Sequence, residues 1–363
     1  MYISQVSGHR QSAVAIAKSL KNLNPDCEIM SINGFGYAYP VMEKIINTAY
    51  MGVIKRAPKI WEYLYDNPKV IKASAKWKQS VYKSSHKKLK PLIDEFKPDV
   101  VVCTQAFPCG MVADYKKTNN LPMTVVGVLT DYAPHLYWLN GGVDYYVVPS
   151  QEAKTRYMGE GVKEEQIKEF GIPIRMKFAE KLDRVAIAKK LGLDANAPTI
   201  LVMGGGQGLG PMKEAVKSLV RLPRNVQLIV ICGTNVKLVH WLKKTQRKTT
   251  KKIIFYEYAN NVDELMEVAT MIVTKPGGMT TSECLTKGLP MVIVDPIPGQ
   301  EERNSQFLVN QGIAIRVDDK HHIAKDIEAL LNDAPKLTAM RQAALKNSKP
   351  MAAENIARFI LGT

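Results

Sequence analysis

Short apolar runs alternate with amphipathic stretches along almost the whole chain. The runs are rich in β-branched residues and are bounded by turn-forming residues, a pattern that predicts strands. Between them, stretches such as 11–23 and 211–220 repeat apolar residues three and four apart, which predicts helices. Apolar strands that alternate with helices indicate parallel sheets covered on both faces, so we predict an α/β protein.

The predicted strands form two series. They are 2–6, 27–32, 99–104, 123–129 and 145–148 in the first half, and 199–203, 226–232, 253–256, 271–274, 291–294 and 314–317 in the second. The alternation breaks around 171–175, so we predict two doubly wound domains facing a central cleft, at 1–172 and 173–340. We expect 341–363 to form a C-terminal helix that packs back toward the first domain.

Composition narrows the class of protein. Of the 363 residues 46% are hydrophobic, which is ample for two cores, and no apolar run reaches the ~18–20 residues that span a bilayer. The first six residues lack a basic start before an apolar stretch, so we expect no signal peptide. Five cysteines, never spaced as CxxC, indicate reduced cytoplasmic thiols and argue against a zinc site.

A net charge of +16 indicates a polyanionic partner, either nucleic acid or an anionic membrane. Segment 40–90 holds twelve Lys/Arg against three acids, a net +9 of that total. Plotted at ~100° per residue, five of its lysines share one sector of about 60°, with Val70, Trp77 and Val81 nearly opposite. The sector contains Lys72, Lys76, Lys83, Lys87 and Lys90. The segment therefore predicts a basic amphipathic helix.

Two interpretations of this helix stay open: a solvated lysine face over a packed core, or a membrane-binding face. Aromatic rings suit the headgroup layer, and each nearby lysine adds roughly 1 kcal/mol against anionic lipid, which favours the membrane. The candidate membrane residues are Trp61, Lys72, Lys76, Trp77, Lys83 and Lys87. Nucleic acid is the weaker option, because the chain has neither zinc-finger spacing nor an aromatic RNP signature.

The sharpest motif is Met203-Gly204-Gly205-Gly206-Gln207-Gly208-Leu209-Gly210-Pro211, between a predicted strand and a helix. Glycines let backbone N–H groups approach phosphates, and a helix N-terminus adds a partial positive charge. No Gly-Lys-Ser/Thr follows, so it is not a Walker A loop. A plain turn is the alternative, but five glycines in seven residues favour a diphosphate cradle.

A second motif, Lys275-Pro276-Gly277-Gly278-Met279-Thr280-Thr281-Ser282-Glu283, also follows a predicted strand. Thr280 and Glu283 have the spacing of a capping box, in which Glu283 would satisfy the helix start. The competing interpretation is that the Glu283 carboxylate accepts hydrogen bonds from the ribose hydroxyls of a nucleotide. The residues alone leave both open.

The third motif is Asp295-Pro296-Ile297-Pro298-Gly299-Gln300-Glu301-Glu302-Arg303-Asn304. Its Pro and Gly residues predict a loop that presents Gln300, Glu301 and Asn304 together. This set offers both donors and acceptors, as the hydroxyls of a hexose require. An ordinary acidic helix N-terminus is the alternative.

The first domain offers two candidates for acid–base chemistry. His9 follows the first predicted strand, and a histidine there could take a proton from an acceptor hydroxyl, although a lone histidine is more often a structural hydrogen bonder. Asp131 and His135 follow another predicted strand and would face the cleft.

In this order, the three motifs and the His9 loop resemble the glycosyltransferase family of bacterial processive diacylglycerol glucosyltransferases and plant monogalactosyldiacylglycerol synthases. Lys97-Pro98-Asp99 and Pro298-Gly299-Gln300-Glu301 extend the resemblance over nearly the whole chain. The loop Val6-Ser7-Gly8-His9 is poorer in glycine than the family's Gly-Gly-Gly-His form. The resemblance implies the GT-B fold of two Rossmann-like domains.

The resemblance also implies a function: inverting, metal-independent transfer of a hexose from UDP-glucose or UDP-galactose to diacylglycerol or a glycosyl-diacylglycerol. No prosthetic group is expected. The first domain would bind lipid and membrane and the second the UDP-sugar, in a cytoplasmic protein peripheral on the inner face of the cell membrane. The implied donor residues are Gly206, Gln207, Gly208, Gly277, Gly278, Met279, Thr280, Glu283, Gln300, Glu301 and Asn304. His9 is implied as the base or as a group that positions the acceptor, and Asp131 stays the other candidate base from its place after a strand.

Three other functions fit parts of the sequence. Transfer of N-acetylglucosamine to a polyprenyl-linked precursor shares the fold, but segment 40–90 favours diacylglycerol. A UDP-sugar epimerase would leave that segment without a purpose. A non-catalytic UDP-sugar sensor is disfavoured, because His9, Glu283 and Gln300 are all present.

Overall fold

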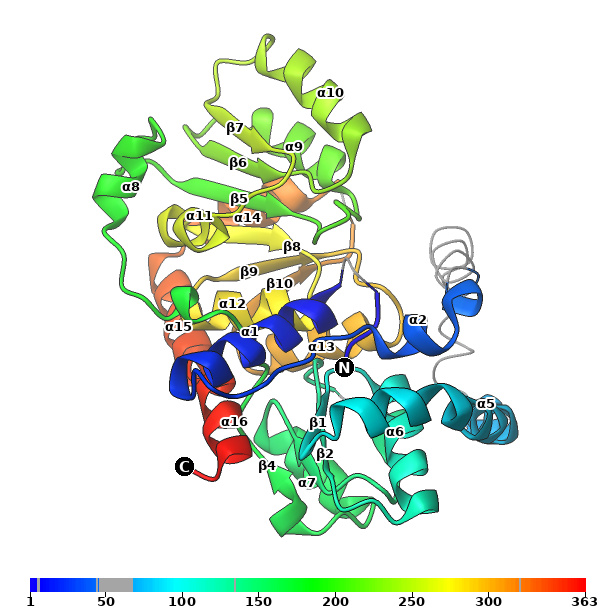
Figure 1. Cartoon of the computed structure of the whole chain (residues 1–363). Helices are drawn as coiled ribbons and strands as arrows, with labels where there is room; N and C mark the ends of the chain where they lie inside the picture. Colours follow the sequence, from blue (N-terminus) through cyan, green and yellow to red (C-terminus); the bar gives the residue numbers. More distant parts are fainter. Residues whose placement is uncertain (5–6, 44, 46–67, 134, 320) are drawn as a thin grey trace. The chain divides into compact units, whose positions relative to one another are not determined.

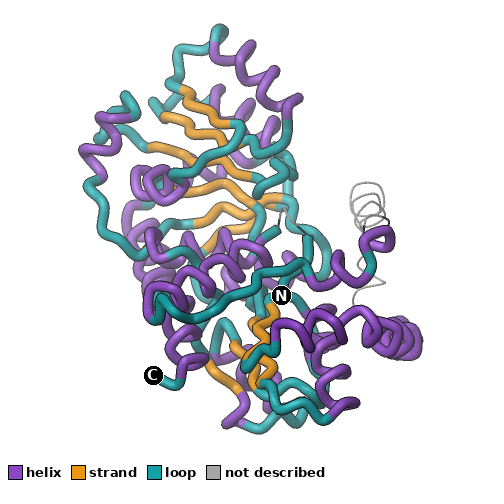
Figure 2. Tube along the Cα trace, viewed as in Figure 1, coloured by secondary structure: helices purple, strands orange, loops and turns teal. Residues whose placement is uncertain are grey.

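The chain divides into two compact units. The computed structural model describes residues 1–363 except 5–6, 44, 46–67, 134 and 320. The first unit comprises Met1–Met176, Ile297–Gln300 and Pro350–Thr363, and the second comprises Lys177–Pro296 and Glu301–Lys349. Each unit has its own parallel sheet with helices around it (Figures 1 and 2).

The described part of the first unit forms a parallel sheet in the order β1-β2-β3-β4. Its strands are β1 (Val100–Cys103), β2 (Thr124–Val128), β3 (Tyr145–Val147) and β4 (Ile167–Lys168). Its described helices are α1 (Gly8–Leu23), α2 (Gly34–Ala38), α5 (Pro68–Phe96), α6 (Ala106–Asn119), α7 (Gln151–Gly159) and α16 (Ala352–Leu361), with 3₁₀ turns η1 (Leu136–Trp138) and η2 (Glu164–Gln166).

The second unit carries a parallel sheet in the order β10-β9-β8-β5-β6-β7. Its strands are β5 (Thr199–Met203), β6 (Gln227–Ile231), β7 (Ile253–Tyr256), β8 (Met271–Thr274), β9 (Met291–Val294) and β10 (Ala314–Val317). Its described helices are α8 (Arg184–Lys190), α9 (Met212–Val220), α10 (Val236–Gln246), α11 (Val262–Val268), α12 (Gly278–Lys287), α13 (Gln300–Asn310, which starts at the unit boundary), α14 (Ile323–Leu331) and α15 (Ala334–Lys346); turn η3 (Met176–Phe178) spans the other boundary.

In the first half, the strand predicted at 27–32 is wrong, and so is the described part, 2–4, of the strand predicted at 2–6; residues 5–6 lie outside the described residues. In place of strands at 2–6 and 27–32, the described residues there form one isolated bridge between Tyr2 and Asn33. Ser4 has a φ of 59°, a left-handed conformation that interrupts an extended run. Without a continuing partner, 27–32 makes no ladder, although the Tyr2 N–H still donates to the Ile32 carbonyl at 3.1 Å.

Helix α16 completes the core of the first unit, although it lies more than three hundred residues after α1. Ile356 and Ala357 form one buried cluster with Ile16 and Leu20 of α1 and with apolar residues of β2 and β3. The ring of Phe359 adds an edge contact to Tyr145, with centroids 4.9 Å apart. The second unit has a separate buried cluster, built from β5, β6, α9 and α14 among others.

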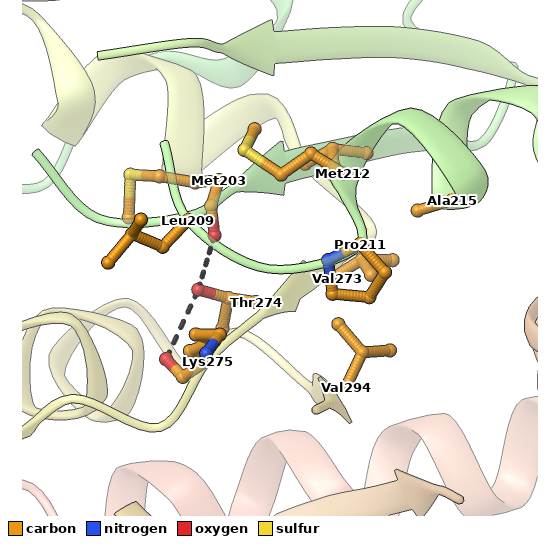
Figure 3. Close-up of a pocket in the computed structure, with 10 residues that line it drawn as sticks. Met203, Leu209, Pro211, Met212, Ala215, Val273, Thr274, Lys275 and Val294 are labelled. Atoms are coloured by element: carbon orange, nitrogen blue, oxygen red, sulfur yellow. Dashed lines mark hydrogen bonds between the residues drawn. The ribbon is translucent and has the colours of Figure 1, made fainter. Parts of the chain in front are cut away.

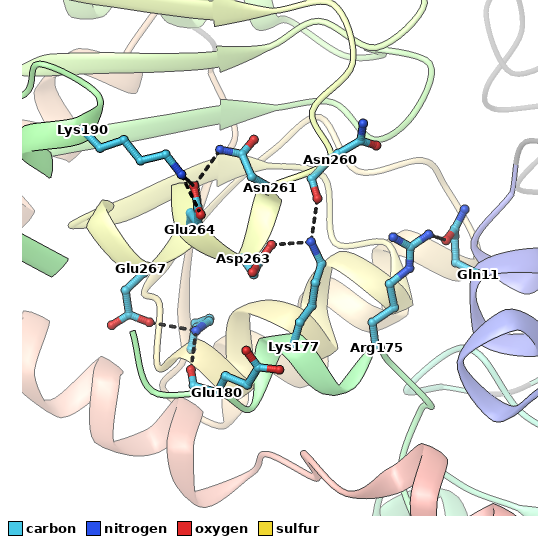
Figure 4. Close-up of polar contacts among 11 residues, drawn as sticks. Gln11, Arg175, Lys177, Glu180, Lys190, Asn260, Asn261, Asp263, Glu264 and Glu267 are labelled. Atoms are coloured by element: carbon cyan, nitrogen blue, oxygen red, sulfur yellow. Dashed lines mark hydrogen bonds and ion pairs between the residues drawn. The ribbon is translucent and has the colours of Figure 1, made fainter. Parts of the chain in front are cut away.

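The chain is anchored on each side of the boundary at Met176–Lys177. Before it, the Arg175 guanidinium donates to Gln11 at 2.6 Å, within the first unit. After it, the Lys177 ammonium donates to the Asn260 carbonyl at 2.6 Å and pairs with Asp263, within the second unit (Figure 4). Each unit therefore holds its own end of this connection.

Candidate active site

The glycine loop is a tight turn at the carboxyl end of β5. The Gly208 N–H donates to the Gly205 carbonyl at 3.1 Å, and the Leu209 N–H donates to the Gly204 carbonyl at 2.9 Å. Gly205, Gly208 and Gly210 have φ values of 68°, 58° and 90°, in the left-handed region that other residues rarely adopt. The glycines are therefore needed for the shape of the loop.

A second loop, Cys232-Gly233-Thr234-Asn235 after β6, is hydrogen-bonded to the glycine loop. The Asn235 side chain donates to the Gly208 carbonyl at 3.0 Å, and the Thr234 N–H donates to the Gly206 carbonyl at 3.2 Å. A side chain at Gly208 would come within 2.0 Å of the Cys232 carbonyl oxygen. The 232–235 loop is thus in direct contact with Gly206 and Gly208 of the glycine loop.

This arrangement leaves the tip of the glycine loop with unused donors. Gly205, Gly206 and Gln207 are exposed. Within the described part of the chain, no group accepts a hydrogen bond from the N–H of Gly206 or Gln207. Consecutive free N–H groups near a helix N-terminus are suited to an anion such as a diphosphate. These donors are compatible with the predicted diphosphate cradle, which stays a prediction.

None of the motifs predicted from the sequence includes the 232–235 loop. Asn235 is the N-cap of α10, and its side chain accepts from the Leu238 N–H at 3.1 Å. A glycine after an apolar strand, followed by a capping asparagine, is a signal that could have marked this loop as a second strand-to-helix turn. Its contact with Gly208 is visible only in the folded chain.

The predicted capping box in the second motif is wrong. Helix α12 begins at Gly278, and its N-cap is Gly277, whose carbonyl accepts from the Thr281 N–H at 2.9 Å. Thr280 therefore lies inside the first turn with Met279, and Glu283 lies one turn further along, partly buried. With the cap excluded, a ribose contact of Glu283 stays a prediction.

The third motif is tied to the second. Asn304 is fully buried in α13, and its Nδ2 donates to the Pro276 carbonyl at 3.0 Å. The Glu301 carboxylate lies 3.9 Å from the Lys275 ammonium. Asn304 thus braces the turn that starts α12, and its predicted sugar contact remains untested.

Gln300, the first residue of α13, belongs with Ile297–Gln300 to the first unit, whereas Glu301 and Asn304 belong to the second. Its side-chain amide donates to the Asp131 carboxylate of the same unit. The structure thus brings together a predicted sugar-binding residue and a predicted base. His135 has a structural contact instead, because its Nδ1 accepts from the Tyr137 N–H at 3.1 Å.

His9 lies in the first turn of α1 and is held by residues at two strand ends. Its Nδ1 is 2.9 Å from the Thr104 carbonyl oxygen and 3.0 Å from the Thr130 hydroxyl, and the Thr104 hydroxyl donates to the His9 carbonyl at 2.8 Å. A carbonyl can only accept, so the proton lies on Nδ1 and Nε2 keeps its lone pair. Burial lowers the His9 pKa to about 4, so the ring is neutral at physiological pH.

A small pocket lies beneath the glycine loop (Figure 3). Apart from Thr274 and Lys275, its lining is apolar, with Val202, Leu209, Met212 and Val273 among the residues. The Thr274 hydroxyl donates to the Met203 carbonyl at 2.7 Å and joins the ends of β8 and β5. An apolar lining does not suit a diphosphate, so the exposed tip of the loop is the better candidate.

The predicted basic helix is confirmed as α5. Lys83 and Lys87 are exposed on it, whereas Val81 is buried. Trp77 is 49% exposed, although its ring is 5.9 Å from that of Phe107, so it is less buried than its predicted apolar position implied. Trp61 and the side chains of Lys72 and Lys76 lie outside the described residues.

Related proteins match nearly the whole chain. The processive diacylglycerol beta-glucosyltransferase of Bacillus cereus is 32% identical over 358 residues, which cover 98% of this chain and 90% of the relative. The protein of the same name from Bacillus mycoides gives the same figures. The chain belongs to the family of the processive diacylglycerol beta-glucosyltransferases. The resemblance predicted from its motifs is confirmed.

Models of protein families match both parts of this family member. Residues 9–174 match a model described as monogalactosyldiacylglycerol (MGDG) synthase, and residues 199–356 match the glycosyltransferase family 28 C-terminal domain. The two matches separate where the strand–helix pattern restarts. The chain is therefore a glycosyltransferase.

Solved structures show the fold of this glycosyltransferase. MurG of Acinetobacter baumannii has a TM-score of 0.66 and 14% identity, with 100% of this chain and 98% of MurG covered. MnaA of S. aureus, solved with UDP, has a TM-score of 0.63 and 14% identity, with 100% and 96% covered. At such identities the likeness concerns the fold alone, and it confirms the predicted GT-B fold.

The described residues also bear on membrane insertion. Among them, none of the helices combines the length and the apolar character required to cross a bilayer.

Proposed function

We propose that this glycosyltransferase moves a hexose, glucose or galactose, from its UDP-sugar to diacylglycerol or a glycosyl-diacylglycerol. The observation that carries the proposal is the exposed tip of the glycine loop, where the N–H groups of Gly206 and Gln207 are free to bind a diphosphate. The relatives are named for the lipid acceptor, and 32% identity over 98% of the chain supports the same acceptor here.

In this proposal the second unit binds the donor. Gly206, Gln207 and Gly208 hold the diphosphate, and the Glu283 carboxylate accepts from the ribose hydroxyls. The N-cap Gly277 and the first turn of α12, which contains Gly278, Met279 and Thr280, lie next to the nucleotide in this proposal. Glu301 contacts the hexose, and Asn304 holds the turn at Pro276 in place. Gln300 is assigned to the hexose as well.

The first unit activates the acceptor in this proposal. His9 presents an unprotonated Nε2, because its Nδ1–H is held by the Thr104 carbonyl. This nitrogen takes the proton of the acceptor hydroxyl while the hydroxyl oxygen attacks the anomeric carbon and the bond to the diphosphate breaks. A single displacement of this kind inverts the anomeric configuration. Asp131 is the alternative base.

We also propose that α5 brings the enzyme to an anionic membrane, at the inner face of the cell membrane. Lys83 and Lys87 are exposed on this helix and Trp77 is half-exposed. Exposed lysines are attracted to anionic lipid, and a tryptophan ring suits the headgroup layer.

The test is a transfer assay with purified protein and vesicles that contain diacylglycerol. UDP-glucose, UDP-galactose and UDP-N-acetylglucosamine are supplied separately, and free UDP and glycolipid are measured. We expect glycolipid with one or both hexose donors, in step with UDP release. UDP release without glycolipid, or product with UDP-N-acetylglucosamine alone, would overturn the proposal.

A further inference from the structure

Lys275, the first residue after β8, is a nearly buried cation beside the glycine loop. Its side chain is 12% exposed. The aliphatic part of the side chain lies against Gly210, since a Cβ built on that glycine would be 2.9 Å from Lys275 Cε. Lys275 and Leu209 line the same pocket (Figure 3). Lys275 therefore packs against the glycine loop that we assign to the donor diphosphate.

Among the described residues, the ammonium of Lys275 has no hydrogen-bond partner. In the part of the chain that the structure describes, its Nζ donates no hydrogen bond, and its ion-pair partner, the Glu301 carboxylate, is 3.9 Å away. An ammonium carries three N–H donors, and leaving them unsatisfied away from water is costly. The site is therefore incomplete without an anionic group that accepts hydrogen bonds.

Lys287, the last residue of α12, is a buried lysine of the same unit whose ammonium does have hydrogen-bond partners, and it serves as a comparison for Lys275. Its side chain is 3% exposed, and its ammonium lies 2.8 Å from the Glu267 carboxylate and 3.0 Å from the Glu180 carbonyl. Both lysines are largely buried and flank the same helix. Lys287 is satisfied by the protein, whereas Lys275 is left with a loose ion pair.

We propose that Lys275 binds the diphosphate of the nucleotide sugar and stabilises the departing UDP; this inference rests on the proposed function. Negative charge distinguishes the diphosphate from the other parts of the donor, and Gly210 belongs to the loop that offers the free N–H groups. Glu301 keeps the ammonium oriented when the donor is absent.

The charge of Lys275 matters most while the glycosidic bond breaks. The bond between the anomeric carbon and the β-phosphate oxygen is cleaved, and its electron pair stays on that oxygen. UDP therefore leaves with one more negative charge than it had as an ester, and the acceptor's proton goes to the base. A fixed cation stabilises this developing charge more than it stabilises the bound donor, which raises the rate of transfer.

The experiment titrates UDP, UMP and uridine into the full chain and into Lys275→Gln by calorimetry. Hydrogen bonds to charged groups contribute about 1.5–3 kcal/mol, so UDP affinity should fall by roughly ten- to a hundredfold. Uridine affinity should stay unchanged, since uridine lacks phosphate. Lys217→Gln, which removes an exposed lysine of α9, is the matched control and should bind all three ligands like wild type.

The outcomes separate the inference from the proposed function. No UDP binding by wild type would overturn the proposed function. If wild type and Lys275→Gln bind UDP equally well, the role of Lys275 in diphosphate binding is overturned and the proposed function stands. The same conclusion follows if Lys275→Gln loses uridine affinity as strongly as UDP affinity. If Lys275→Gln does not fold, Lys275→Met keeps an unbranched apolar stem for the pocket and is expected to show the same selective loss of UDP.

Discussion

The Nδ1 atom of His9 lies 2.9 Å from the backbone carbonyl oxygen of Thr104, just beyond the end of β1. This bond fixes the tautomer and leaves Nε2 as the acceptor of a proton. We therefore expect His9→Ala to slow transfer by about 10²–10⁴-fold, the usual loss for a general base, while UDP affinity is retained. The control is His240→Ala, which removes an exposed histidine of α10. Near-normal turnover of His9→Ala would move the assignment to Asp131.

The low pKa of His9 predicts an unusual pH profile. Because burial lowers it to about 4, the ring keeps its lone pair across the range in which a free histidine titrates. Transfer should not decline around pH 6.5 and should fall only as the pH approaches 4. A rate that halves near pH 6.5 and follows a single histidine titration would contradict this environment.

The same shift affects stability in a defined direction. The folded pKa is below that of the unfolded chain, so from pH 6.5 down to about 4 only the unfolded state binds this proton. As the pH falls from 6.5 to about 4, the free energy of unfolding of wild type should therefore decrease. That of His9→Gln should decrease by less over the same range. Denaturant unfolding at pH 7.5 and pH 5 measures the difference.

The glycine loop allows a paired test of backbone shape. Gly205→Ala and Gly208→Ala both place a side chain at positive φ, at a cost of roughly 1–2 kcal/mol. Only Gly208→Ala also clashes with the Cys232 carbonyl, because the added Cβ would lie 2.0 Å from that oxygen, whereas the space at Gly205 is open. Gly208→Ala should melt at the lower temperature and lose UDP binding. Equal melting temperatures would mean that the two loops are not pressed together in solution.

Asn235 performs two tasks that substitution can separate. Asn235→Ala removes both the cap of α10 and the bond to the Gly208 carbonyl, so stability should fall by about 1–2 kcal/mol. Asn235→Ser keeps a capping oxygen but cannot supply the amide donor. It should recover most of the stability and still bind UDP about two- to tenfold more weakly, in line with one neutral hydrogen bond. Wild-type UDP affinity in Asn235→Ser would remove the loop contact from donor binding.

The basic face of α5 predicts membrane attachment. Replacing Lys72, Lys76, Lys83 and Lys87 with Gln should remove about 4 kcal/mol of attraction to anionic vesicles at low salt, at roughly 1 kcal/mol per charge. That is close to a thousandfold loss, and wild-type binding should itself weaken as salt rises. UDP affinity should not change.

The matched control for this variant removes four exposed lysines in or near α10: Lys237, Lys243, Lys244 and Lys248. Equal losses in both quadruple variants would assign the attraction to net charge rather than to this helix. Duplex DNA and RNA are tested beside the vesicles, and stronger binding to either would favour nucleic acid.

The sequence predicts the second sheet better than the first. The bounds of β5, β7, β8, β9 and β10 match their predicted ranges, because each is a short, mostly apolar run of β-branched residues bounded by turn-forming residues. The strand predicted at 2–6 fails because Ser4 turns the backbone into the left-handed region, which no apolar pattern reveals.

In the candidate site, too, local features can be predicted from the sequence and contacts between distant residues cannot. Its glycine loop is visible in the sequence, because five glycines serve one local turn. The Asn235 bond to Gly208 and the position of Lys275 against Gly210 are not visible, since each joins residues that are distant along the chain. The capping box failed for a different reason: Gly277 has the extended backbone of an N-cap, so α12 starts before Thr280.

Helix α16 makes the order of folding differ from the order of synthesis. Its residues Ile356 and Ala357 cover Ile16 and Leu20 of α1, and about 330 residues are translated between the two helices. At roughly 5–20 residues per second, a nascent chain would wait about 15–65 seconds before this apolar surface could be covered. Over that interval the second unit emerges with all of its strands. The unit encoded first is thus the last to complete its core, and the apolar residues Ile16 and Leu20 of α1 stay uncovered until α16 is made.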